Sequence, residues 1–246
     1  MNLYHYLLKL VFTRDKMAKK RVFIVGFFIT LTLLIGVLFS NLIFNNLRED
    51  ALMVRMSDMI SDYEEIQTLI LMADFFGEES ACIALEGLLS EMNKDLWGLG
   101  MKIDQYRQVT EEFTESEFYF TQKKLFNQRA VLYYTTMRRM QEMCNLDQVI
   151  MTFFYKNSED CPECDPLSFV LTDIRQDLDR MGIVDRLPLF SFDVDLDLAG
   201  INILLRHYNI TEFPCVVLNE NVFCGLKNKN EMKDIICIYG SEELCY

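Results

Sequence analysis

Two cysteines with the spacing of a redox pair stand at the start of a predicted helix. They belong to Cys161-Pro162-Glu163-Cys164, the CPEC motif, which follows an apolar, β-prone run at residues 149–155. The first cysteine of such a pair lies at a helix N-terminus, where unpaired N–H groups and the helix dipole stabilise a thiolate. The spacing therefore predicts thiol–disulfide exchange, in which Cys161 attacks a substrate sulfur and the more buried Cys164 resolves the mixed disulfide.

The elements that position the CPEC motif are predicted from short apolar runs and turn residues. A strand before the motif and a helix after it are followed by a strand, a helix, a β-hairpin and a closing helix, at residues 149–155, 169–178, 189–194, 198–208, 213–226 and 231–238. Pro214 lies near the start of the β-hairpin. Strands that alternate with helices in this way predict an α/β domain.

This order of elements resembles the thioredoxin superfamily over about residues 149–240. The resemblance is carried by the CPEC motif just after the first strand, by residues 192–195 (FDVD) at the end of the second, and by residues 210–214 (ITEFP) before the β-hairpin. It implies that Pro214 is cis and lies against the CPEC motif. It also implies that Phe213 offers its backbone to an extended substrate segment.

Charged residues next to the CPEC motif depart from the family pattern. Asp160 stands where thioredoxins carry Trp, and Glu159 and Glu163 add further negative charge. Like charges disfavour a thiolate, so we expect Asp160, Pro162 and Glu163 to tune the pair to a less oxidising potential than that of a relative with His between its cysteines. The strand before the motif offers no carboxylate that could accept a proton from Cys164.

Two other interpretations of the CPEC motif stay open, a purely structural disulfide and half of a zinc site. Zinc needs four ligands, and the sequence has no second CxxC and only two histidines, His5 and His207. No metal is therefore expected. The sequence also has no glycine-rich phosphate-binding loop, so we predict no nucleotide or other cofactor.

Four cysteines near the C-terminus allow three pairings that the sequence does not decide. They are Cys215, Cys224, Cys237 and Cys245. A bond between Cys237 and Cys245 would pin the C-terminal tail to the closing helix, and we favour it as a structural disulfide. Cys215, which directly follows Pro214, is interpreted as a buried small residue rather than a third catalytic thiol.

The region between residues 45 and 148 is predicted to be helical. It contains no proline, and its apolar residues recur every three or four positions in seams at 52–70, 82–106 and 126–144. The last two seams can be laid antiparallel around a turn at 109–114, so that Cys82 faces Cys144. Outside the cytoplasm a structural disulfide is expected there, with two buried free thiols as the alternative. The region then forms either a three-helix bundle or a helical hairpin that dimerises.

The N-terminal region predicts a membrane anchor. Residues 22–44 are an uncharged apolar run that is long enough to span a bilayer as a helix, and residues 1–21 carry six basic residues and one acidic residue. The positive-inside rule then places the N-terminus in the cytoplasm and residues 45–246 outside it. A cleaved signal peptide is the alternative, although the apolar run is long for one.

These patterns predict an α/β thioredoxin-like domain at 149–246, preceded by a basic leader (1–21), a transmembrane helix (22–44) and an all-α helical hairpin or three-helix stalk (45–148). The formal net charge of −13 argues against binding to nucleic acid. The expected function is thiol–disulfide exchange by a membrane-anchored, single-pass protein, on exported proteins or with a membrane redox partner. The alternatives are a non-catalytic surface binding module and a structural stalk protein that forms homodimers.

Overall fold

The computed structural model describes residues 25–40, 54, 64–72, 75, 77–107, 117–146, 148–157 and 159–245. The chain divides into two compact units, Met1–Val54 and Arg55–Tyr246, and all eight cysteines belong to the second. The predicted leader at 1–21 and the predicted turn at 109–114 lie outside the described residues.

The prediction of a transmembrane helix at residues 22–44 is wrong. Within the first unit the structure describes a helix over residues 25–40. No helix in the described part of the chain is long and apolar enough to cross a membrane. The same finding contradicts the predicted single-pass localisation, with the N-terminus in the cytoplasm and residues 45–246 outside it.

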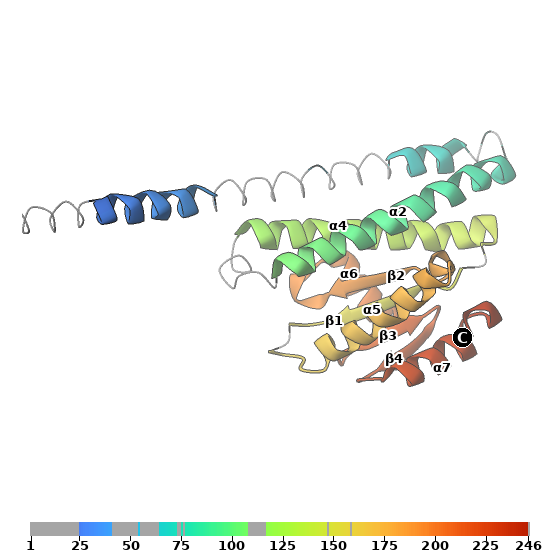
Figure 1. Ribbon diagram of the computed structural model, residues 1–246. Coiled ribbons are helices and arrows are strands. Elements are labelled where there is room, and N and C mark those ends of the chain that lie inside the picture. Colours follow the sequence, from blue (N-terminus) through green and yellow to red (C-terminus); the bar gives the residue numbers. More distant parts are fainter. Residues whose placement is uncertain are drawn as a thin grey trace, which may run out of the picture. The chain divides into compact units, whose positions relative to one another are not determined.

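A four-stranded mixed sheet lies at the centre of the second unit (Figure 1). Its strands are β1 (Met151–Tyr155), β2 (Leu189–Asp193), β3 (Cys215–Leu218) and β4 (Asn221–Cys224), in the order β2-β1-β3-β4. β2 is parallel to β1 because helix α5 (Cys164–Arg180) crosses over between them, whereas the tight turn after β3 makes β4 its antiparallel neighbour. The α/β part of the predicted fold class is confirmed, and the elements follow one another in the predicted order.

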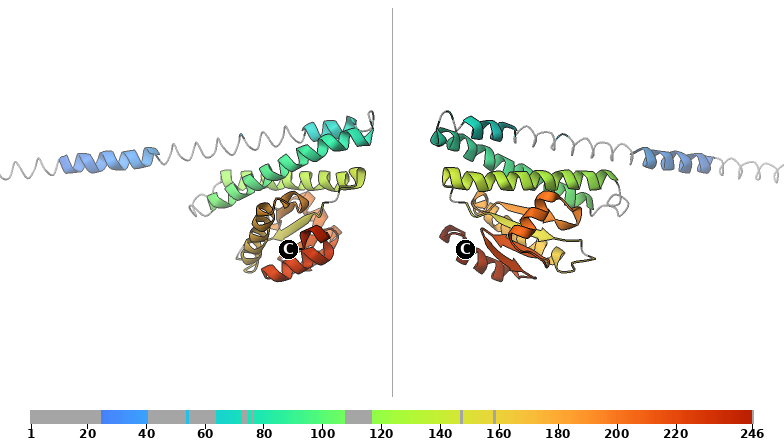
Figure 2. Two further views of the ribbon diagram at one scale, coloured as in Figure 1. Left: turned by 45° about the vertical axis from the view of Figure 1, so that its right-hand side comes forward. Right: turned by 180° about the vertical axis from the view of Figure 1, so that it is seen from behind.

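Helices cover both faces of the sheet. α5 and α7 (Lys229–Tyr239) lie on one face and α6 (Ala199–His207) on the other (Figure 1, Figure 2). Because side chains alternate along a strand, Phe153 points toward α5 and α7, while Phe154 points to the opposite face and packs on Phe192. The core under α5 and α7 includes Met151, Phe153, Leu167, Leu171, Ile174, Leu178, Val216, Leu218, Met232 and Ile236. This apolar core holds α5, and with it the CPEC motif, against β1.

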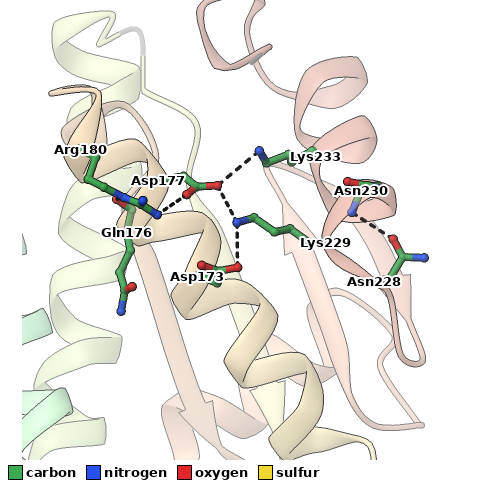
Figure 3. A network of polar contacts seen from close by, with 8 residues as sticks. All are labelled: Asp173, Gln176, Asp177, Arg180, Asn228, Lys229, Asn230 and Lys233. Carbon is green, nitrogen blue, oxygen red and sulfur yellow. Dashed lines mark hydrogen bonds and ion pairs between the residues drawn. The ribbon is translucent and has the colours of Figure 1, made fainter.

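A network of ion pairs links α5 to α7 at the surface of this core (Figure 3). The carboxylate of Asp177 lies 2.7 Å from Nζ of Lys229, 3.3 Å from Nζ of Lys233 and 2.6 Å from Nη2 of Arg180. Asp173 accepts a second contact from Lys229, at 2.7 Å. The hydrogen bond from Lys229 holds the pKa of Asp177 below its usual value, and the contact with Asp173 holds the pKa of Lys229 above its usual value.

The low pKa of Asp177 makes its contribution to stability depend on pH. A carboxyl group whose pKa is lower in the folded than in the unfolded state stabilises the fold above the unfolded-state pKa, and the stabilisation disappears as the pH falls through the folded-state pKa. We expect Asp177→Asn to lower the urea midpoint at pH 7 by less than about 1 M, because the pairs lie at the surface and are partly exposed. The two midpoints should converge as the pH falls below the ordinary pKa of an aspartate, through the lower pKa of folded Asp177. A difference that stays constant between pH 7 and pH 2 contradicts this assignment.

Helices α2 (Glu78–Arg107) and α4 (Glu117–Cys144) lie side by side and form an antiparallel α2–α4 hairpin (Figure 2). The Cys82–Cys144 disulfide joins the start of α2 to the end of α4. Toward the other end, a Cβ on Gly100 would lie only 3.1 Å from Cζ of Phe126, so the helices approach closely there. The two helices therefore pair in the register that the apolar seams at 82–106 and 126–144 predict.

The first of the three predicted stalk helices is described only in part. Residues 64–72 are helical, and Ile66 among them is fully buried. Most of the remaining seam at 52–70 lies outside the described residues. The choice between a dimerising hairpin and a three-helix bundle therefore stays a prediction.

The Cys82–Cys144 disulfide is expected to be a major contributor to the stability of the second unit. It closes a loop with a sequence separation of 62, whereas Cys237–Cys245 closes one of 8. On the chain-entropy model these loops contribute about 4 and about 2.5 kcal/mol. We expect Cys82→Ala/Cys144→Ala to lower the free energy of unfolding in urea by more than Cys237→Ala/Cys245→Ala does. Equal losses, or a larger loss for the shorter loop, contradict the prediction.

The α2–α4 hairpin covers one edge of the sheet. β2 is an edge strand, and α4 lies along it. Oδ1 of Asn127 accepts the backbone N–H of Asp193 at 3.0 Å, and Lys123 forms an ion pair with the Asp193 carboxylate. On the face of β2 that carries Phe190 and Phe192, the ring of Tyr134 packs edge-on against Phe190. The hairpin therefore shields a strand edge that would otherwise be open to pairing with other chains.

Further contacts join the hairpin to both faces of the sheet domain. The hydroxyl groups of Tyr134 and Tyr208 lie 2.6 Å apart, and burial raises the pKa of Tyr134. On the other face the guanidinium of Arg175 lies 4.4 Å from the centre of the Trp97 ring, and burial lowers the pKa of Arg175 to about 10. The hairpin and the sheet thus belong to one compact unit. The predicted division of the chain at residue 148 stays a prediction.

Candidate functional site

The CPEC motif lies in a turn between β1 and α5. Cys161 and Cys164 form a disulfide, and α5 begins at Cys164. The N–H of Cys161 donates to the carbonyl of Asn157 at 2.9 Å, and the N–H of Cys164 donates to the carbonyl of Cys161 at 3.0 Å. Glu163, at the N-cap position, makes no side-chain capping bond. The positive end of the α5 dipole therefore lies next to the disulfide without a side-chain cap.

Both cysteines of the motif are buried. Cys161 is 3% exposed and Cys164 is 1% exposed, so the predicted difference between an accessible and a buried sulfur is small. The N–H of Lys156 also donates to Sγ of Cys164, at 3.4 Å. A substrate sulfur can therefore reach Cys161 only after a movement that exposes its Sγ.

Pro214 lies at the same end of the sheet as the CPEC motif. Phe154, near the end of β1, pairs with Cys215 at the start of β3. The Phe213–Pro214 peptide bond directly before Cys215 is cis, in agreement with the geometry that the family resemblance implies. Antiparallel pairing thus brings the start of β3 beside the turn that carries the cysteines.

Two contacts connect the Pro214 side of the site with the CPEC side. The ammonium group of Lys156 lies 5.5 Å from the centre of the Phe213 ring. The N–H of Leu226, just after β4, donates to Oε2 of Glu163 at 3.2 Å. The structure therefore brings together Phe213, the CPEC motif and the segment after β4, which are far apart in the sequence.

The residues predicted to tune the redox pair lie on the surface around it. Asp160, Pro162 and Glu163 are all exposed. Oδ2 of Asp195 accepts the N–H of Asn157 at 2.7 Å, which adds another carboxylate at the base of the turn. The influence of these residues on the redox potential stays a prediction.

A buried carboxylate near the site was missed by sequence reasoning, which considered only the strand before the motif. Asp193 ends β2, pairs in register with Tyr155 at the end of β1, and is 1% exposed. Its partner is Lys123, which belongs to α4. The sequence FDVD contained the carboxylate, but no local pattern indicated that a helix from another part of the chain would supply the cation.

A cavity of about 150 Å³ lies between the α2–α4 hairpin and α5. Cys164 and Ser168 line it from α5, Tyr155 lines it from β1, and Trp97 and Lys123 line it from the hairpin. Cys164 thus borders this cavity. The hairpin is therefore part of the environment of the redox pair.

Comparisons with known proteins give one distant likeness. No family model and no curated protein matches the chain. A solved thioredoxin-2, described as a component of malaria parasite protein secretion machinery, is similar over 36% of this chain and 81% of that chain, at 18% identity and a TM-score of 0.29. A likeness at this TM-score carries no argument about the fold or function of this chain.

The four cysteines at 215, 224, 237 and 245 are also paired. Cys215 is fully buried and bonds to Cys224, directly opposite it in the β3–β4 register, while Cys237 bonds to Cys245. Of the three pairings that the sequence allows, the structure has this one. Among the described residues no group of three His, Cys, Asp or Glu side chains could hold a metal ion.

Proposed function

We propose that the second unit is a thioredoxin-like thiol–disulfide oxidoreductase that acts on cysteines of other proteins. The observation that carries the proposal is the position of the Cys161–Cys164 disulfide, at the start of α5 and at the same end of the sheet as the cis Pro214. The uncapped helix N-terminus favours the thiolate form of a nearby cysteine.

The proposed reaction transfers two electrons and two protons. The thiolate of reduced Cys161 attacks one sulfur of a substrate disulfide, a mixed disulfide forms, and the other substrate sulfur leaves as a thiolate that takes up a proton. Cys164 loses its proton and attacks Sγ of Cys161, which releases the second substrate thiol. The substrate is reduced and the CPEC motif is oxidised; the reverse sequence oxidises a substrate dithiol.

A non-catalytic binding module is the second candidate function, and the burial of both sulfurs favours it. A disulfide whose cysteines are 3% and 1% exposed is shielded from attacking thiolates in the way that structural disulfides are. In that case the face around Pro214 binds a partner, and the disulfide only holds the turn in shape.

A redox titration of the full chain distinguishes the two functions. The protein is equilibrated in thiol–disulfide buffers, alkylated, and digested, and the Cys161–Cys164 peptides are quantified by mass spectrometry. A potential between about −120 and −270 mV supports exchange, and one well below about −300 mV indicates a structural disulfide. The Cys82–Cys144 pair is an internal control in the same digest, since we expect it to stay oxidised throughout.

A further inference from the structure

The surface around the CPEC motif combines a small apolar centre with carboxylates. Leu226 is 45% exposed and its N–H is bonded to Glu163, Pro162 is exposed, and the half-buried Phe213 ring lies under Lys156. Pro162 lies between the two cysteines, Leu226 bonds to Glu163 next to Cys164, and Phe213 precedes Pro214 at the same end of the sheet. We expect an extended chain segment that delivers a sulfur to Cys161 to contact these residues.

Four exposed carboxylates form the acidic rim of this surface: Glu159, Asp160, Glu163 and Glu212. Glu159, Asp160 and Glu163 belong to the turn that holds the cysteines, and Glu212 directly precedes Phe213. Among the described residues no ion pair neutralises Glu159, Asp160 or Glu212. Within the described part of the chain, the rim therefore presents negative charge that no ion pair offsets.

The cations near the rim are already engaged in other contacts. Lys156 lies over the Phe213 ring, and Nζ of Lys227 donates to the carbonyl of Cys224 at 2.8 Å. Among the described residues, these two lysines stand beside the four rim carboxylates and Asp195, which accepts a hydrogen bond from the same turn. Like charges across an interface slow association and opposite charges accelerate it.

We propose that the acidic rim selects protein substrates in which Lys or Arg residues flank the reacting cysteine. This inference rests on the proposed exchange function and adds the class of substrate to it. The basic residues lie over the rim while the substrate sulfur meets Cys161, so the preference arises mainly in the association rate. Because the rim is exposed, the preference weakens as salt screens the charges.

Three peptides that differ only in the residues flanking one intramolecular disulfide test the inference. The flanks are Arg, Gln or Glu, and each rate of reduction by the reduced full chain is divided by the rate of the same peptide with dithiothreitol. This division removes differences in the intrinsic reactivity of the peptides. We expect the Arg peptide to react about 10-fold faster than the Glu peptide at low salt, with a ratio that falls several-fold in 0.5 M NaCl.

Two double variants of equal net charge show whether the preference for the Arg peptide comes from the acidic rim. Glu159→Gln/Asp160→Asn removes two rim carboxylates, and Glu142→Gln/Asp234→Asn removes two exposed carboxylates from α4 and α7. We expect the Arg-to-Glu rate ratio to fall at least threefold in the rim variant and to stay unchanged in the control. Equal normalised rates for the three peptides, or equal falls in both variants, overturn the inference and leave the exchange function standing. No reaction with any peptide overturns the exchange function, and the inference with it.

Discussion

The Cys161→Ser chain is expected to lose exchange with protein disulfides, with a rate at least about 1,000-fold lower than that of the unchanged chain, because a serine hydroxyl does not attack a disulfide sulfur. Cys164→Ser should behave differently. It keeps the attacking sulfur and removes the resolving one, so a mixed disulfide with the substrate should accumulate. The measurement is the second-order rate with a disulfide peptide, together with mass spectrometry of the trapped species.

The comparison of the two serine variants separates their chemical roles from a structural role of the disulfide. Both variants break the same bond, so both lose the same constraint on the turn that precedes α5. If only structure mattered, the two would behave alike. A mixed disulfide at Cys164 in the Cys161→Ser chain would reverse the assigned roles. A partner bound equally well by the unchanged chain and both variants, with no exchange by any of them, would favour the binding module.

The Lys123→Met chain is expected to be less stable by about 3–5 kcal/mol, because the substitution leaves a buried carboxylate without its counter-charge. The side chain of Lys123 is 15% exposed and that of Asp193 only 2% exposed. The measurement is urea unfolding at pH 7, followed by far-UV circular dichroism. A loss below about 1 kcal/mol, the usual range for exposed pairs, contradicts this assignment.

A double variant serves as the control for this loss. Lys123→Met/Asp193→Asn removes both charges, and the Asn side-chain oxygen can still accept the N–H of Asp195, which bonds to Oδ1 of Asp193 at 2.9 Å. We expect the double variant to recover most of the lost stability, since no charge is left buried. A double variant as unstable as Lys123→Met would show that the loss comes from the packing of the lysine stem in α4.

The position of the pair explains why its effect should extend beyond one contact. Lys123 and Asn127 of α4 both bind Asp193, at the end of the edge strand β2, and Lys123 also lines the cavity that reaches Cys164. Loosening α4 at this point removes a wall of that cavity. The hairpin therefore supports both the sheet edge and the surroundings of the redox pair.

Some predictions from the sequence succeeded because they rest on short-range patterns. The alternation of short strands and helices depends on local apolar periodicity, and the order from β1 to α7 follows it. The antiparallel register of α2 and α4 follows from two helical seams and a turn between them, and it places Cys82 opposite Cys144. These features depend on which residues recur at a fixed spacing, which a sequence shows directly.

Other predictions failed or stayed undecided. The apolar run at 22–44 predicted a spanning helix, but among the described residues no helix has the length and hydropathy of a membrane span. The pairing of Cys215 with Cys224 depends on the register of β3 against β4. The sequence allowed three pairings, and strand register decided between them.

The amino-acid sequence was enough to predict the place of the CPEC motif between a strand and a helix, and the proline that precedes β3. The folded structure was needed to show that both cysteines are buried, that Asp193 is a buried carboxylate beside β1, and that Lys123 is its partner. The physical reason is the range of the interactions. Helix and strand patterns arise between residues a few positions apart, whereas burial and ion pairing at this site arise where α4 meets β2, between residues that only folding brings together.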